Sequence, residues 1–235
     1  MKLYRLPDYN AVCRKAAGLI AAQINSKPDS VMAWPTGSTP VGVYEKLVEL
    51  YNRKELDFSE ITSFNLDEYR GLSQSAPQSF HSFMGEHLFG KVNVNKEKMF
   101  FPDGNAKDIE AECHRYEALI ASQGGIDFMF LGIATNGHIA FNEPDDIFST
   151  MTNCVTLHEE TVQAMLPSFD DPKDVPRQAI TMGIKTLMKA RKILLVANGP
   201  SKKEIMEKAL YGPIVPRIPA SVLQLHPDLT VIWGD

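Results

Sequence analysis

Two short apolar runs constrain the fold of this 235-residue chain more than any other feature. The run IDFMFLGI spans residues 126–133, and ILLVA spans residues 193–197. Both are bounded by glycine or polar residues and have the length of strands that are buried on both faces. Strands of that kind are typical of parallel sheets, because helices cover both sides of such sheets. The two runs therefore predict an α/β fold.

The rest of the chain alternates further short apolar runs with segments of helical periodicity. Strands are predicted at residues 30–34, 61–66 and 229–233, and helices at 12–24, 39–51, 78–88, 106–122, 159–165, 184–189 and 201–210. This alternation implies a mostly parallel sheet with helices on both faces. Because no repeat, low-complexity tract or linker interrupts it, we expect residues 1–235 to form a single domain.

Composition narrows the class of partner. The net charge is −5, and the 24 Lys and Arg residues are scattered, whereas nucleic acid requires a basic stripe. No apolar run has membrane-spanning length, and the N-terminus lacks the apolar core of a secretory signal, so we expect no membrane partner and a cytoplasmic location. Cys13, Cys113 and Cys154 lie far apart without zinc-site spacing, which favours buried free thiols over a metal site.

Ligands of open parallel sheets bind beyond the carboxyl ends of the strands, so the loops after the apolar runs are the candidate site. The first such loop is WPTGSTP at residues 34–40, where Gly37 permits a tight turn. The hydroxyls and amides of Thr36, Ser38 and Thr39 then lie at a helix start, where they could cradle a phosphate. The alternative is an ordinary helix cap. The loop lacks the lysine of a P-loop, which argues against a nucleoside triphosphate.

The second loop, NLDEY, follows the strand at 61–66 and contains Asp67 and Glu68. Adjacent side chains at a strand end point to different sides, so we expect only one carboxylate to enter the site. A carboxylate at this position could move a proton between neighbouring carbons of a sugar. The alternative is a solvated turn.

The third loop spans residues 131–144 and provides the strongest signal. His138 follows Gly137 after a buried strand, and Glu143 lies five residues further on. A histidine there could shuttle a proton to or from a ring oxygen while Glu143 fixes its tautomer. The alternative is a structural histidine. Metal binding is weaker, because no second histidine has ligand spacing.

The fourth loop, residues 198–203, places Lys202 at a predicted helix start. A cation opposes the helix dipole at that end, which indicates a bound anion, although a solvated lysine is the alternative. Four other histidines point to no site: His81, His87 and His114 lie on predicted helices, and the role of His226 is left open.

Four motifs carry a family resemblance. PTGSTP, NLDEY, GHIAFNEP and PASVLQLH (residues 219–226) stand in the order and spacing of glucosamine-6-phosphate deaminases, and the likeness extends over residues 31–231. The resemblance implies a Rossmann-like, three-layer fold without nucleotide or metal. It also implies a sugar-phosphate substrate and the reaction of glucosamine 6-phosphate and water to fructose 6-phosphate and ammonia.

The same resemblance implies roles for individual residues. Asp67 resembles the base that takes the C2 proton and returns it at C1, and His138 resembles the ring-opening acid/base that Glu143 orients. The resembling phosphate- and sugar-binding residues are Thr36, Gly37, Ser38, Thr39 and Lys202. Asn136, taken with the catalytic residues, stands where longer family members carry an aspartate, and shorter members resemble this chain there. An asparagine can hydrogen-bond there but cannot act as an acid.

A second departure concerns the phosphate. The family usually has an arginine where Pro167 stands, and the nearest arginine here is Arg177. A lost bidentate contact weakens phosphate binding unless Arg177, Lys203 or a backbone amide replaces it. Galactosamine-6-phosphate relatives also tend to lack this arginine, so their substrate is the first alternative. A 6-phosphogluconolactonase-type hydrolase is the second, and a non-catalytic sugar-phosphate sensor is the third.

Two further expectations come from the resemblance. The chain ends at Asp235, before the C-terminal extension of long allosteric members, and Asn153 and Val155 replace their basic effector-binding residues. We therefore expect no activation by N-acetylglucosamine 6-phosphate. Residues 157–175, rich in Pro, Asp and Met, are expected to form a mobile lid over the site. Nothing in the sequence predicts an oligomeric state.

Overall fold

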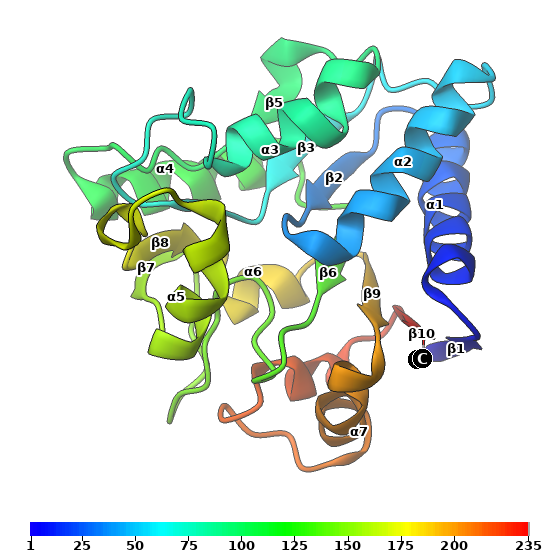
Figure 1. Cartoon of the computed structure of the whole chain (residues 1–235). Coiled ribbons are helices and arrows are strands. Elements are labelled where there is room, and N and C mark those ends of the chain that lie inside the picture. The colour runs from blue at the N-terminus through cyan, green and yellow to red at the C-terminus, as the bar shows by residue number, and fades with distance from the viewer. Residues whose placement is uncertain (235) are drawn as a thin grey trace.

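A seven-stranded sheet forms the centre of the computed structural model, which describes residues 1–234 (Figure 1). Every pair of neighbouring strands is parallel. In spatial order the strands are β1 (Lys2–Leu6), β10 (Leu229–Gly234), β9 (Lys192–Asn198), β6 (Phe128–Gly132), β2 (Val31–Trp34), β3 (Thr62–Asn65) and β5 (Met99–Phe100). The predicted α/β fold with a mostly parallel sheet is confirmed.

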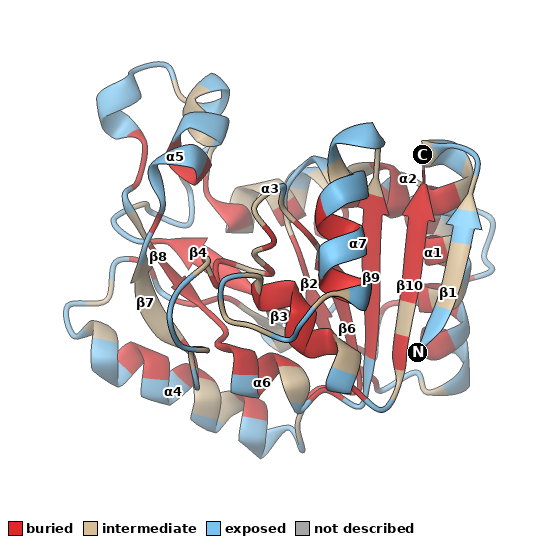
Figure 2. Ribbon diagram, turned by 90° about the horizontal axis from the view of Figure 1, so that it is seen from below, coloured by how far each residue is buried: buried red, intermediate tan, exposed pale blue. Residues whose placement is uncertain are grey.

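Helices cover both faces of this sheet, as the apolar strands require (Figure 2). One face packs against α1 (Tyr9–Ser26), α2 (Ser38–Asn52) and α3 (Phe80–His87). The other packs against α4 (Ile109–Ser122), α6 (Ile184–Met188) and α7 (Lys203–Tyr211). Because successive strand side chains alternate between the faces, Leu194 and Leu195 of β9 enter different cores.

A smaller antiparallel sheet, which we did not predict, lies beside the carboxyl ends of the central strands. Its order is β4 (Asp67–Tyr69), β8 (Gln178–Thr181) and β7 (Asn153–Thr156). The short helix α5 (Glu159–Met165) follows β7, and its outer face is exposed (Figure 2). Short 3₁₀ turns occur at Phe89–Lys91, Lys96–Lys98, Leu166–Ser168, Pro172–Asp174, Pro200–Lys202 and Pro219–Leu225.

All predicted helices and strands are present, and their bounds differ from the prediction by three residues or fewer. Five strands were not predicted, namely β1, β4, β5, β7 and β8. Within residues 1–234, no helix is both long and apolar enough to cross a bilayer.

The chain path opens a crevice at the middle of the large sheet. After β2 the chain crosses by α2 to β3, toward one edge of the sheet. After β6 it passes through the small sheet and α6 to β9, toward the other edge. Neighbouring strands whose connections depart in opposite directions leave room between their loops, and that is where ligands bind in open α/β sheets.

Candidate active site

A cavity of about 410 Å³ occupies this crevice, and we call it the central cavity. Its lining comes from the loops after β2, β3, β6 and β9, together with residues of α5. Eight residues selected from the sequence line it: Thr36, Gly37, Ser38, Thr39, Asp67, Asn136, His138 and Lys202. The ninth, Glu143, lies directly behind His138. The structure therefore brings all four loops to one place.

The loop after β2 leaves the start of α2 free. Gly37 adopts φ +97°, which favours glycine, and no side chain caps the helix. The capping alternative is therefore wrong for Ser38 and Thr39. The first amides of a fifteen-residue helix and the two hydroxyls stay available to an anion that enters the cavity.

The two acids of the loop after β3 point to different sides, as predicted. Glu68 is fully buried and accepts hydrogen bonds from the amides of Tyr69, Phe80 and His81, so it fixes the start of α3. Asp67 instead lines the central cavity. Glu68 is thus structural, and Asp67 is the carboxylate that a ligand would meet.

The environment of Asp67 favours its neutral form. Burial first, and then the charge of neighbouring Glu68, raise the pKa of Asp67 from 3.8 to about 8. Within the described part of the chain, no donor offsets this burial by a hydrogen bond to the carboxylate. A positively charged group that binds nearby lowers the pKa of such a carboxyl group, so that it ionises and can act as a base.

His138 is held from behind by Glu143. The distance from Nδ1 of His138 to Oε2 of Glu143 is 3.2 Å, and Nδ2 of Asn136 donates to the same oxygen at 2.9 Å. The amide of His138 donates to Oδ1 of Asn136 at 3.1 Å. Because a carboxylate can only accept, Nδ1 carries the hydrogen and Nε2 is left as the nitrogen that can accept a proton in the cavity.

The charge on Glu143 is strongly stabilised. Burial opposes ionisation, but hydrogen bonds from His138, Thr161 and Asn136, with the charge of a protonated imidazole, lower the pKa of Glu143 to about 2. The turn before His138 requires glycine, since Gly137 has φ +90° and a Cβ there would lie 3.0 Å from Ile205. Asn136 is a donor to Glu143, whereas an aspartate there would place a second negative charge against the carboxylate.

Lys202 provides the positive charge of the cavity. Burial lowers the pKa of its ammonium, and the charge of Glu160 opposes that shift. Neither suggested substitute for the arginine joins it: Arg177 is exposed and pairs with Glu159 at 2.5 Å, and Lys203 is exposed outside the lining. The suggestion that Arg177 or Lys203 replaces the phosphate-binding arginine is therefore wrong. Lys202 and the start of α2 remain as the groups that could bind a phosphate.

One wall of the cavity contains none of the residues selected from the sequence. Side chains of β4, α3, the loop after β6 and α5 form it, namely Tyr69, Phe80, Phe141, Glu160, Thr161, Ala164 and Met165. The aromatic members pack closely, with 4.2 Å between the ring centroids of Tyr69 and Phe80. The members from α5 lie in residues 157–175, the segment that was expected to cover the site, whereas no sequence signal indicated the aromatic members.

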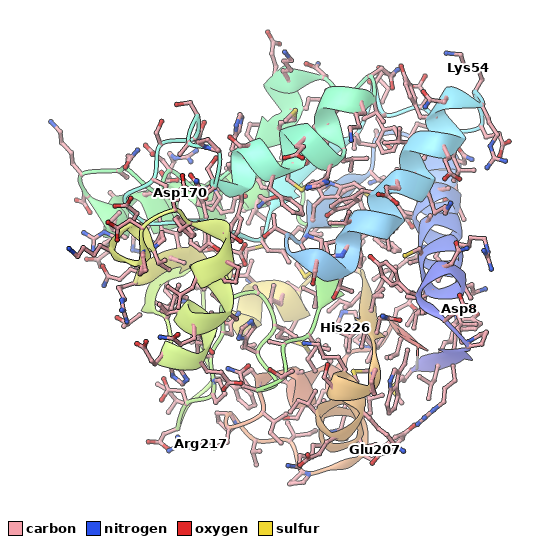
Figure 3. All side chains as sticks on the ribbon, viewed as in Figure 1. Asp8, Lys54, Asp170, Glu207, Arg217 and His226 are labelled. Atoms are coloured by element: carbon pink, nitrogen blue, oxygen red, sulfur yellow. The ribbon has the colours of Figure 1, made fainter. Side chains whose placement is uncertain are left out.

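His226, which the sequence left open, is structural. Figure 3 labels its position. It is 4% exposed, and its Nε2 lies 2.8 Å from the carbonyl of Ala190, while Nδ1 accepts from the amide of Asp228. It therefore ties the last loop to the central sheet. Among residues 1–234, no group of three or more His, Cys, Asp and Glu side chains could hold a metal ion.

Comparison with known proteins agrees with this geometry. Residues 8–233 match the family model described as glucosamine-6-phosphate isomerases/6-phosphogluconolactonase. The chain is 54% identical to a glucosamine-6-phosphate deaminase of Lachnoclostridium phytofermentans, covering 99% of this chain and 98% of the relative. It is 49% identical to the deaminase of Halothermothrix orenii, covering 96% and 93%.

Solved structures give the same result. The chain superposes with a TM-score of 0.97 on a monomeric glucosamine-6-phosphate deaminase at 44% identity, over 100% of this chain and 97% of the other. A 6-phosphogluconolactonase from Thermotoga maritima shares the fold at a TM-score of 0.77 and 20% identity, over 100% and 99% of the two chains. This chain belongs to the family of glucosamine-6-phosphate isomerases and 6-phosphogluconolactonases.

Proposed function

We propose that this chain converts glucosamine 6-phosphate and water to fructose 6-phosphate and ammonia. One observation carries the proposal: a carboxyl group without a protein donor, an imidazole with one nitrogen free, and a lysine beside an uncapped helix start line the same cavity. The reaction requires a base at carbon, an acid/base at the ring oxygen and a site for a phosphate dianion.

The proposed phosphate-binding groups are Ser38, Thr39 and Lys202, which all line the central cavity. Two hydroxyls, free helix amides and one ammonium give charge-assisted hydrogen bonds, which compensate for the arginine that Pro167 replaces. This arrangement leaves the carbon chain of the sugar to reach Asp67 and His138.

His138 opens the ring in the proposed first step. Nε2 takes the proton of the C1 hydroxyl and returns it to the ring oxygen, which converts the pyranose to the open-chain aldehyde. Glu143 stabilises the imidazolium that forms between these two transfers, because its negative charge lies 3.2 Å from Nδ1.

Asp67 moves the proton between carbons in the next steps. Its carboxylate removes the C2 hydrogen, O1 takes a proton from the ammonium group of the substrate, and Asp67 returns its proton to C1, which leaves an iminium at C2. Water then adds to C2, and ammonia departs to give the ketone. The ammonium group of the substrate favours ionised Asp67 on binding, so the base is activated only in the complex.

The relatives favour glucosamine over galactosamine as the substrate. The relatives from Lachnoclostridium phytofermentans and Halothermothrix orenii, 54% and 49% identical, are both glucosamine-6-phosphate deaminases. The 6-phosphogluconolactonase from Thermotoga maritima is only 20% identical and supports the fold alone.

The direct test measures ammonia release by the purified chain with glucosamine 6-phosphate and galactosamine 6-phosphate in parallel, and with Asp67→Asn as the matched control. We expect release from the first substrate and a release rate lower by about 10²–10⁴-fold from the variant. Release only from galactosamine 6-phosphate would refute the substrate, and release from neither by folded protein would refute the reaction.

We also propose that the active chain is a monomer. The proposal rests on the 44% identical relative of known structure, which is described as monomeric. Gel filtration should give a mass near 26.2 kDa. A hexamer with activity would contradict this proposal.

A further inference from the structure

The carboxylate behind His138 is held from two sides, and only one of them belongs to its own loop. Oε2 of Glu143 faces Asn136 and His138. Oε1 instead accepts from the hydroxyl of Thr161 at 2.5 Å and from the amide of His158 at 3.3 Å. These two donors lie at the start of α5, within the segment 157–175 that was expected to cover the site.

The second side matters because a carboxylate turns about its last carbon–carbon bond. Contacts to Oε2 alone would leave that rotation open, and a turned carboxylate points away from Nδ1 of His138. Donors on both oxygens define the plane of the group. Of the two donors on Oε1, the Thr161 hydroxyl is much the closer, and Thr161 is 7% exposed.

We propose that Thr161 is a positioning residue that holds the Glu143 carboxylate against Nδ1 of His138 and so fixes the tautomer of the ring-opening histidine. This inference rests on the proposed function for its catalytic consequence, but the tautomer itself can be observed without substrate. A hydroxyl has one proton, and here it is given to Glu143. Thr161 therefore acts through Glu143 although it lines the central cavity.

The ring of His158 is the competing candidate for this role. Its Nδ1 lies 3.9 Å from Oε2 of Glu143, beyond hydrogen-bond distance, and its side chain is 48% exposed. Its amide contact is made by the backbone and survives any substitution except proline. We therefore expect the His158 ring to contribute little, which makes His158→Asn a useful comparison within the same helix start.

The kinetic test compares Thr161→Val with Thr161→Ser. Valine keeps the shape of threonine but removes the donor, and we expect kcat to fall about tenfold or more, as for a lost hydrogen bond to a charged group. KM should change much less, because the hydroxyl is not given to substrate. Serine keeps the donor and should restore most of kcat, whereas His158→Asn should resemble the native chain.

A matched control separates positioning from stability. Thr186 also donates to a glutamate, Glu117, at 2.5 Å, outside the central cavity. Thr186→Val removes an equivalent bond, and we expect a lower melting temperature without loss of kcat. If both valine variants lose kcat in proportion to stability, Thr161 is merely structural and the proposal fails.

The closing measurement is ¹⁵N NMR of the His138 ring in the empty protein. In the native chain and in Thr161→Ser, we expect the hydrogen on Nδ1, and in Thr161→Val a mixture of tautomers. An unchanged Nδ1 signal in the valine variant overturns the proposal. Absence of deaminase activity in the native chain would refute the proposed function and leave this result to decide the positioning role separately.

Discussion

The two sheets of this protein differ in burial and in what they contribute to the cavity. The inner strands of the parallel sheet, β2, β6 and β9, are almost fully enclosed by helices. In the antiparallel sheet, the edge strand β7 is half-buried, and α5 beside it is largely exposed (Figure 2). The large sheet supplies the loops with Lys202 and His138, whereas the small sheet supplies Asp67 on β4.

The two sheets therefore contribute differently to the stability of the fold and to the reactivity of the site. Burial of apolar strands is the main source of folding free energy, and most of it lies in the parallel sheet. The small sheet keeps a carboxyl group in a site that disfavours its charge and lets α5 reach Glu143. Elements that carry strained or moving parts of a site are drawn from the less stable regions of a fold. We expect substitutions in the two sheets to affect different measurements.

The largest effect should come from Asp67→Asn. Loss of a general base costs about 10²–10⁴-fold in kcat, and we expect phosphate binding to persist because Ser38, Thr39 and Lys202 are unchanged. In the native chain, kcat/KM should rise with pH up to about 8, the pKa of free Asp67. The corresponding limb of kcat should lie at lower pH, because the bound ammonium favours the carboxylate. Coincident limbs, or normal turnover by the variant, would refute the assignment.

The same substitution should raise the free energy of unfolding at high pH. The folded-state pKa of Asp67 is raised above its ordinary 3.8, so its stabilising contribution is complete below that pH and is lost as pH rises to about 8. Asparagine does not ionise. At pH 9, Asp67→Asn should therefore unfold with a free energy about 1–2 kcal/mol higher than the native chain, as for other sites where function opposes stability. Denaturant unfolding at pH 5 and pH 9 measures the difference.

Shortening one apolar side chain in each sheet tests whether the large sheet contributes more to stability than the small sheet. Leu195 in β9 is 0% exposed, so Leu195→Ala should lower the free energy of unfolding by about 2–5 kcal/mol. Val155 in β7 is half-buried, and Val155→Ala should cost about 1 kcal/mol or less. Both variants should retain kcat at a temperature where they are folded. Equal losses of stability would contradict the division between the sheets.

The difference in burial between the two sheets also explains which strands could be predicted from the sequence. The runs at β6 and β9 are apolar because both faces are buried, so they are visible without a structure. Four of the five missed strands are either edges (β1, β5 and β7) or only three residues long (β4), and they carry no such run. The strand β8 reads QAIT, which is too short and too polar to distinguish from a turn.

The site could be predicted where it follows the large sheet and not where it depends on the small one. Thr36, His138 and Lys202 were found because they come directly after recognisable strands. Thr161 was not selected, because it lies eighteen residues from Glu143 along the chain. Only the folded arrangement of β7 and α5 brings the two residues together. The positions of Asp67 and Glu68 were predicted by alternation, but the amides that bind Glu68 belong to α3 and required the fold.

Lys202→Ala should have an intermediate effect, on binding. Loss of one charge-assisted contact to phosphate should raise KM by about 10- to 100-fold with little change in kcat, as expected for a contact that is equal in the ground and transition states. Lys203→Ala is the matched control, because Lys203 is exposed outside the central cavity and should leave KM unchanged. A fall in kcat alone would move Lys202 from the phosphate to the chemistry.

The smallest expected effect is the absence of a response to N-acetylglucosamine 6-phosphate. Asn153 and Val155 on β7 line a groove of about 1150 Å³ behind Glu143, and neither carries a charge to pair with phosphate. Half-saturation by substrate should be the same with and without this compound. If the compound did lower half-saturation, the small sheet would connect the groove to the base. The strand β7 pairs with β8, and Thr181 of β8 pairs with Asp67. A clear fall in half-saturation would mean that a ligand in the groove acts on the base through this sheet, and that the small sheet regulates the site as well as forming it.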